Sequence, residues 1–229
     1  MTNIRLSKRL KCIADMVDNE SILVDVGCDH ALLDIYLSKK RVIKKAIACD
    51  ITKGALNQAK KNILVSNVKN IETRLGDGLD VIDAKDNVDT IVMSGLGDQK
   101  IIGVLNKNTH KLKSVDTIII QSNTGISKVR KNITLMGYYI EDECLVKEKG
   151  IIYTIIKFKK GFKRYTKKEL ELGPVILKNK NDLFNELLKN MIDKNWYVIS
   201  KIPNHMFFKK MRLRLANFRL KKEMINEES

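Results

Sequence analysis

The sequence predicts an α/β protein with a mostly parallel, seven-stranded sheet, followed by a C-terminal helical hairpin or coiled coil. Three observations carry this prediction. Short apolar runs alternate with amphipathic helical patterns five times, two later runs have hairpin spacing, and the last third of the 229 residues is basic and helical in pattern. Repeated strand-helix units favour a parallel sheet covered by helices on both faces, because such crossovers are right-handed.

An amphipathic helix over residues 3–18 opens the chain, with basic residues opposite its apolar face. Five parallel strands are predicted over residues 22–26, 45–50, 70–75, 88–93 and 117–121. The helices between them cover residues 32–37, 52–64, 101–105 and 127–136. Thr52 is a suitable N-cap for the second of these helices, since its hydroxyl can accept from a backbone N–H of the first turn.

The last two predicted strands, residues 138–146 and 151–158, are joined by Lys147-Glu148-Lys149-Gly150. A short connection that ends in glycine is typical of a β-hairpin. The hairpin adds an antiparallel edge to the parallel sheet. This is the architecture of class I, Rossmann-like methyltransferases.

A basic segment follows the hairpin, and we place the domain boundary there, with residues 1–160 as the sheet domain and 161–229 as the helical domain. Proline is well tolerated at the first position of a helix, so Gly173-Pro174 predicts a helix start. Pro203 interrupts the helical pattern before a last helix. Two antiparallel helices are the simplest fold for this tail.

Charge is concentrated in the same tail. The chain carries a net charge of +16, and the part from Lys157 onward holds 19 Lys/Arg against 8 Asp/Glu. Such a surplus indicates a polyanionic partner and favours nucleic acid, although a solvated lysine-rich coiled coil would have the same composition. Four scattered cysteines and three histidines form no metal-binding pattern, so we expect no metal and a reducing cytoplasm. No segment approaches the ~20 apolar residues of a membrane span.

Polar and glycine residues stand where the predicted strands end. The first strand ends at Asp25-Val26-Gly27-Cys28-Asp29-His30, with one glycine where dinucleotide-binding turns have three. The missing glycines are those that let a pyrophosphate approach, so a phosphate-free cofactor fits this turn better. Asp50, at the end of the second strand, can accept both hydroxyls of a ribose. The alternative for Asp50 is a helix cap or a surface acid.

Three further strand ends carry similar residues. Gly76-Asp77-Gly78 follows the third strand, and its carboxylate can accept from an adenine amino group, although a plain turn has the same sequence. Ser94-Gly95 follows the fourth strand. Gln121-Ser122-Asn123 ends the fifth, and its amides can read the edge of a base or cap the next helix. Parallel strands end at one sheet edge, so these groups predict one ligand site.

These residues resemble the bacterial tRNA (adenine(22)-N1)-methyltransferase family. The family pattern L-x-x-R-L, A-D-I-G-S-D-H-A, an acid after the second strand, G-D-G-L, G-M-G-G and Q-P-N is matched in order over about residues 1–158. Glu148 and Ile151-Ile152-Tyr153 also resemble the family's final hairpin. Cys28 replaces a serine, Asp98 a glycine and Ser122 a proline, and the last two border the expected base pocket.

The resemblance implies methyl transfer from S-adenosyl-L-methionine to N1 of adenine 22 in the D-arm of tRNA. N1 has its own lone pair, so positioning and water exclusion supply the catalysis. We expect Asp29 to accept a hydrogen bond from the adenine amino group, with Asn123 also in the catalytic set. His30 either contacts the substrate or only fixes the turn. The expected cofactor residues are Asp25, Gly27, Cys28, Asp50, Ile51, Gly76, Asp77, Gly78, Ser94 and Gly95. The expected tRNA residues are Arg9, Gln121, Ser122, Lys209, Lys210, Arg212 and Arg214.

Other functions remain open on sequence grounds. A non-catalytic RNA-binding protein on a methyltransferase fold would keep the basic tail without binding cofactor. A methyltransferase that acts on another RNA would keep both the basic tail and cofactor binding. A nicotinamide-dependent dehydrogenase shares the first turn and the ribose acid, but the single glycine and the basic tail disfavour it. We expect a monomer that binds tRNA and no membrane.

Overall fold

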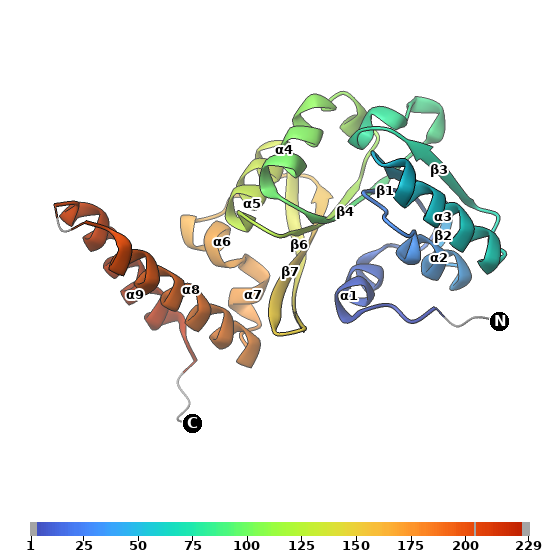
Figure 1. The fold of residues 1–229 in the computed structure, drawn as a ribbon. Coiled ribbons are helices and arrows are strands. Elements are labelled where there is room, and N and C mark those ends of the chain that lie inside the picture. Colours follow the sequence, from blue (N-terminus) through green and yellow to red (C-terminus); the bar gives the residue numbers. More distant parts are fainter. Residues whose placement is uncertain (1–3, 204, 226–229) are drawn as a thin grey trace. The chain divides into compact units, whose positions relative to one another are not determined.

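The computed structural model describes residues 4–203 and 205–225, so the outermost residues of both predicted domains lie outside it. The chain divides into two compact units, Met1–Val175 and Ile176–Ser229. The first unit contains the sheet with its helices, and the second is helical (Figure 1).

A single seven-stranded sheet with the order β3-β2-β1-β4-β5-β7-β6 forms the first unit. Its strands are β1 (Ser21–Val26), β2 (Ile43–Asp50), β3 (Ile71–Leu75), β4 (Thr90–Leu96), β5 (Thr117–Ser122), β6 (Tyr138–Glu148) and β7 (Ile151–Lys160). The first five run parallel, and β7 pairs antiparallel with both β5 and β6. The predicted fold class is confirmed.

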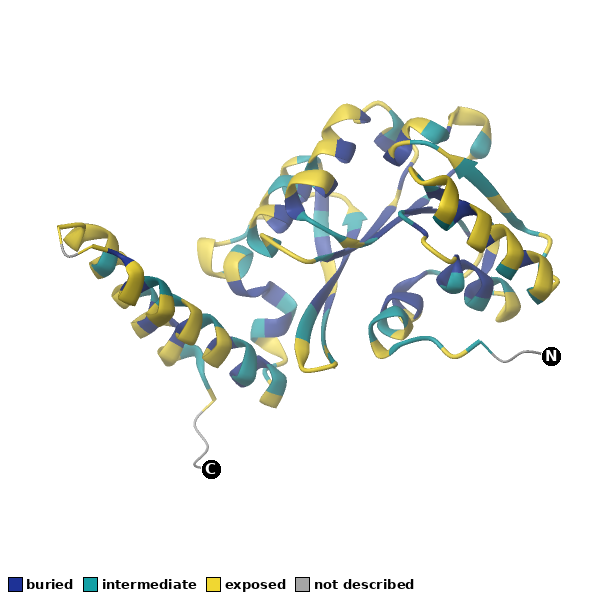
Figure 2. Ribbon diagram, in the orientation of Figure 1, coloured by how far each residue is buried: buried dark blue, intermediate teal, exposed yellow. Residues whose placement is uncertain are grey.

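Helices cover both faces of the sheet (Figure 1). They are α1 (Lys8–Met16), α2 (Leu32–Lys39), α3 (Lys53–Ser66), α4 (Asp98–Lys107) and α5 (Ile126–Leu135). Leu23, Val92 and Ile119 face α1 and α2, whereas their neighbours Val24 and Ile91 face α4 and α5. The central strands are therefore apolar on both sides, which explains their continuous apolar runs. Figure 2 shows these strands as the most buried part of the unit.

The first helix is shorter than predicted. It begins at Lys8, not at residue 3, because Ser7 is its N-cap: the Ser7 hydroxyl accepts from the Leu10 backbone N–H at 3.3 Å. The described residues before Ser7 are not helical. Periodicity alone cannot locate such a start, since apolar spacing continues through the extended segment.

The segment after the hairpin belongs to the first unit, so the observed division falls after Val175, later than the predicted boundary after residue 160. A short helix, α6 (Lys167–Leu172), lies in this segment, where none was predicted, and begins with a capping box formed by Thr166 and Glu169. Arg130 of α5 donates to the Glu171 carbonyl at 3.1 Å, which ties α6 to the sheet domain.

The second unit is a hairpin of α8 (Asp182–Lys201) and α9 (Phe207–Glu223), which follows the short helix α7 (Pro174–Lys178). Pro174 stands at the first position of α7, as predicted. Asn195 of α8 donates to Asn217 of α9 at 2.7 Å, and Lys180 donates to the Glu223 carbonyl at 2.7 Å. Early residues of one helix thus meet late residues of the other, so the two helices are antiparallel.

Candidate active site

The sheet register brings the predicted strand ends together. Val26 of β1 lies opposite Cys49 of β2 and Met93 of β4. Asp50 lies opposite Leu75 of β3, and Ser94 lies opposite Gln121 of β5. The five motifs therefore meet at the carboxyl edge of the sheet, on both sides of the point where the strand order reverses. This is where open α/β folds bind ligands.

The turn after β1 has an unusual backbone. Gly27 has a φ of 78°, and Asp29 and Ala31 are also in the left-handed region, at 49° and 53°. Residues other than glycine rarely adopt this backbone region, so the surrounding structure must hold the turn in place. The helix α2 that follows has no side-chain cap at its N-terminus. Its first backbone N–H groups can therefore bind an anionic group.

A buried carboxyl pair lies behind this turn. Asp25 of β1 is 6% exposed, and Asp34 of α2 is fully buried. Among the described residues, neither side-chain oxygen of Asp34 has a hydrogen-bond partner in good geometry. Burial raises the pKa of Asp25 to about 7, and burial and the nearby Asp25 raise the pKa of Asp34 well above its ordinary value. Both carboxyl groups are therefore harder to ionise than carboxyl groups in water.

Asp34 was not predicted as a site residue. The signal for it was an acid at a core-facing position of α2, between the buried Leu33 and Ile35. Buried acids are rare without a partner, so this position could have been identified from periodicity.

Asp50, at the end of β2, uses one of its two carboxylate oxygens in the hydrogen bonds that the structure shows. Its Oδ1 accepts from the Thr52 backbone N–H at 2.8 Å and from the Thr52 hydroxyl at 2.9 Å. Neither bond uses Oδ2. The next residue, Ile51, is 62% exposed, so an apolar side chain stands beside the carboxylate at the sheet edge. The cap and the ribose interpretations of Asp50 are thus compatible.

The loop after β3 is fixed by close packing. Gly78 has a φ of 62°, and a Cβ atom there would lie 2.7 Å from Val104 Cγ1 of α4. Any other residue here would have a strained backbone and would displace the Val104 side chain. Asp77 is exposed and forms an ion pair with Lys100 at 2.6 Å.

A hydrogen-bond network links the ends of β4 and β5. Gln121 is fully buried, and its Oε1 accepts from the Gly95 backbone N–H at 3.0 Å and from the Ser94 hydroxyl at 3.2 Å. Its Nε2 donates to Asn123 Oδ1 at 3.0 Å. Asn123 in turn donates to the Gly95 carbonyl at 2.7 Å. The orientations of both amides are therefore set by their partners.

Arg9 of α1 completes this network. Its Nη1 donates to Gln121 Oε1 at 2.6 Å, and its guanidinium lies 5.3 Å from the centre of the Tyr153 ring. The Arg9 backbone N–H donates to Glu148 Oε2 at 3.0 Å. The final hairpin thus holds Arg9 against the ends of β4 and β5. Tyr153 and Glu148 support the site although neither was predicted as a site residue.

Asp98 and Ser122, the two departures from the family pattern at the expected base pocket, both bond to Thr124 in the loop after β5. Asp98 Oδ1 accepts from the Thr124 hydroxyl at 2.6 Å. The Ser122 hydroxyl donates to the Thr124 carbonyl at 2.6 Å, a bond within its own loop, and it lies 3.4 Å from the Leu96 carbonyl oxygen at the end of β4. The Asp98–Thr124 bond and the contact of Ser122 with Leu96 join the loop after β4 to the loop after β5.

Most of the remaining predicted residues are exposed. Asp29 and His30 have side chains that are 72% and 48% exposed, and His30 Nε2 lies 3.5 Å from Asp29 Oδ1. Cys28 is buried beside them. The predicted RNA-binding residues Lys209, Lys210, Arg212 and Arg214 lie on α9, in the second unit.

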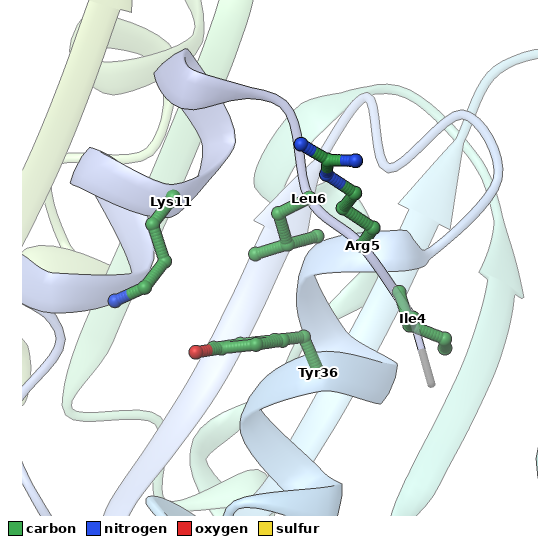
Figure 3. A pocket seen from close by; sticks show the side chains of 5 residues that line it. All are labelled: Ile4, Arg5, Leu6, Lys11 and Tyr36. Carbon is green, nitrogen blue, oxygen red and sulfur yellow. The ribbon is translucent and has the colours of Figure 1, made fainter. Parts of the chain in front are cut away.

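A separate hollow of about 460 Å³ lies between the N-terminal segment, α1 and α2 (Figure 3). It is lined by Ile4, Arg5, Leu6, Lys11 and Tyr36. None of the strand-end residues lines it, so it is distinct from the candidate active site. In the described part of the chain, no three His, Cys, Asp or Glu residues are grouped to hold a metal ion.

Comparison with known proteins decides the family. The family described as tRNA (adenine(22)-N(1))-methyltransferase matches residues 23–227, which cover most of both units. The chain belongs to this family. The tRNA (adenine(22)-N(1))-methyltransferase of Bacillus subtilis is 31% identical over 191 residues, which are 80% of each chain. The predicted family is thus confirmed, and the dehydrogenase alternative is excluded.

Solved structures of tRNA (adenine(22)-N(1))-methyltransferases have the same fold. A putative tRNA (m1A22) methyltransferase of Streptococcus pneumoniae, in complex with S-adenosyl-L-methionine, superposes with a TM-score of 0.89 at 27% identity, covering 96% of this chain and 100% of that one. The Mycoplasma capricolum family member, in complex with S-adenosyl-homocysteine, has a TM-score of 0.85 at 31% identity, covering 95% and 96%. Both matches extend through the helical unit.

Proposed function

We propose that this protein transfers the methyl group of S-adenosyl-L-methionine to N1 of adenine 22 in tRNA. The observation that carries the proposal is the family match over residues 23–227. The predicted cofactor and base residues of this chain also meet at one edge of its sheet. The position of the adenine rests on the family alone.

The residues at the ends of β1, β2 and β3 fit S-adenosyl-L-methionine. The Asp25 carboxyl group and the uncapped N-terminus of α2 suit the ammonium and carboxylate of its methionine part. Asp50 Oδ2 suits the ribose hydroxyls, and the exposed Ile51 suits the adenine ring. Further contacts are assigned to Gly27, Cys28, Gly76, Asp77, Gly78, Ser94 and Gly95. When bound, the cofactor supplies an electrophilic methyl group on a sulfonium.

The residues at the ends of β4 and β5 orient the adenine. Adenine N1 attacks with its own lone pair, so this chain needs no strong base there. Asn123 is exposed at the site, and its amide can meet the Watson–Crick edge of the base. Asp29 accepts a hydrogen bond from the adenine amino group, which disperses the positive charge that forms on the ring. His30 contacts the same base.

The tRNA backbone is bound by cations of the second unit. Lys209, Arg212 and Arg214 are exposed on α9, and Lys210 is half-buried. Arginine and lysine side chains of this kind bind phosphates with little sequence preference. Arg9 acts differently: its hydrogen bond to Gln121 makes it a positioning residue for the base pocket. Ser122 likewise shapes the pocket.

We also propose that the protein is a cytoplasmic monomer. A tRNA substrate and four free cysteines support the compartment. Within residues 4–203 and 205–225, none of the helices is both long and apolar enough to span a bilayer.

The test is methylation of a tRNA transcript with labelled S-adenosyl-L-methionine, followed by reverse transcription. We expect a stop at adenine 22 and no label in a transcript with guanosine at that position. Methylation at another nucleotide would show that adenine 22 is not the acceptor. No label and no heat with S-adenosyl-homocysteine in calorimetry would favour the non-catalytic RNA-binding protein.

Two variants separate the cofactor and base roles. Asp50→Asn should weaken binding of S-adenosyl-homocysteine about tenfold or more, whereas Asp29→Ala should leave it unchanged and slow a single turnover on tRNA. A near-normal single-turnover rate for Asp29→Ala would disprove the role assigned to Asp29.

A further inference from the structure

Helix α9 has two apolar faces on opposite sides. The first contains Leu213, Asn217 and Leu220, of which Asn217 and Leu220 are buried and Asn217 bonds to α8. The second is exposed: its residues follow one another at spacings of four, four and three and therefore lie in one line along the helix. We call this second face the α9 stripe, and it consists of Phe207 (54% exposed), Met211 (46%), Leu215 (47%) and Phe218 (56%).

Cations border the α9 stripe on both sides. At about 100° of rotation per residue, Arg214 and Lys221 fall on one edge and Arg212 and Arg219 on the other. All four are exposed. Lys222 lies within the stripe, with its ammonium 4.6 Å from the centre of the Phe218 ring. The helix holds seven Lys/Arg and one acid, Glu223, which pairs with Lys180.

The positive charge of α9 indicates which kind of partner can bind the α9 stripe. A second copy would bring two such cationic helices together, and the like charges would repel. Coiled-coil seams instead have both signs of charge along their edges. The stripe therefore fits an anionic partner that also presents apolar surface.

The exposed aromatic side chains of α9 indicate which anionic partner binds there. The chain has six phenylalanines, and three of them, Phe207, Phe208 and Phe218, are exposed on α9. Unpaired nucleic-acid bases stack on exposed aromatic rings while their phosphates meet nearby cations. A tRNA has such unpaired bases in its loops.

We infer that the α9 stripe stacks against unpaired bases of the tRNA substrate, while Arg212, Arg214 and Arg219 bind the adjoining phosphates. The inference rests on the proposed function and deepens it, because it assigns base contacts to a helix otherwise expected to bind phosphates only. Stacking tolerates sequence differences, so this contact reads the presence of a loop and not the identity of its bases.

The experiment uses the full chain and measures the dissociation constant for tRNA over a range of salt concentrations. Phe218→Ala should weaken binding about tenfold without changing the slope of log Kd against log salt. Phe218→Tyr should bind as the wild type does, and Phe218→Leu should not, because stacking requires a planar ring. Arg212→Ala should weaken binding and reduce the slope by about 1.

Matched controls separate stacking from loss of structure. Leu64→Ala removes an 81% exposed apolar side chain from α3 and should leave tRNA binding unchanged. Since Phe218 is exposed, its variants should melt within about 2 °C of the wild type, and this is measured in the same experiment.

Several outcomes would overturn the inference. Wild-type tRNA affinity in Phe207→Ala/Phe218→Ala would do so directly. A wild-type dimer that these substitutions dissociate would assign the stripe to a second copy, and loss of binding to phosphatidylglycerol vesicles with tRNA affinity kept would assign it to a membrane surface. One further outcome would support the inference and overturn the proposed function instead: the wild type would methylate no tRNA while the variants still lost RNA affinity.

Discussion

The guanidinium of Arg9 donates a hydrogen bond of 2.6 Å to Gln121, a residue 112 positions later in the chain. Gln121 Oε1 also accepts from Ser94 and Gly95, so its amide nitrogen is turned toward Asn123. Arg9 thereby fixes the orientation of the Gln121 amide at the end of β5, beside the proposed base site.

Arg9→Ala should lower the single-turnover methylation rate at saturating tRNA about tenfold or more. A hydrogen bond to a charged group is worth roughly 1.5–3 kcal/mol, and its loss frees the Gln121 amide to rotate. Affinity for S-adenosyl-homocysteine should stay within about twofold, because Arg9 lies at the ends of β4 and β5. Lys8→Ala, an exposed cation on the same helix, is the control. An unchanged rate in Arg9→Ala would refute the positioning role.

Asp34→Asn should stabilise the protein more at pH 8 than at pH 5. Burial raises the pKa of Asp25 to about 7 and raises that of Asp34 as well, so the folded protein holds protons that the unfolded chain releases above about pH 4. Stability contributed by these groups is therefore complete below about pH 4 and lost as the pH rises toward 7. Asparagine carries no charge at any pH, so the cost of burying residue 34 no longer rises with pH. We expect a gain of about 3 °C or more in Tm at pH 8.

Asp18→Asn provides a comparison of opposite sign. Burial raises the pKa of Asp18, but hydrogen bonds from Lys157 and Lys159 outweigh this and lower it. Asp18→Asn should therefore lose stability at pH 8 and lose less in acid. Equal shifts of Tm at pH 5 and pH 8 for Asp34→Asn would show that the carboxyl pair holds no extra proton.

Arg130→Met should destabilise the first unit by about 3–5 kcal/mol, because Glu143 would remain as a buried charge without its ionic partner. The Arg130 Nε to Glu143 Oε1 distance is 2.6 Å, and both side chains are at most 1% exposed. Arg130→Met/Glu143→Leu should cost less than Arg130→Met alone. Urea denaturation measures both. Lys107→Met, which breaks an exposed pair with Asp80, should change nothing measurable.

The Arg130–Glu143 pair explains why the predicted boundary, after residue 160, precedes the observed division after Val175. Lysines and Gly161 mark residues 159–168 as a linker by composition. The Val175 backbone N–H donates to Glu143 Oε2 at 3.0 Å, however, and Arg130 holds the Glu171 carbonyl. These contacts join the segment to the sheet domain, and composition cannot reveal them. The tRNA-binding role of the second unit stays a prediction.

The sequence by itself determined the family, the parallel sheet and the strand ends at which the site lies, because buried strands, glycine turns and helix caps are local properties of the chain. Asp25, Gly27, Asp50 and Gly78 could be placed at one edge for this reason. Only the tertiary structure decided that Arg9 bonds to Gln121, that Asp34 lies unpartnered beside Asp25, and that α9 exposes a second apolar face. Each of these depends on which surfaces pack together across long sequence separations, and no local pattern encodes that.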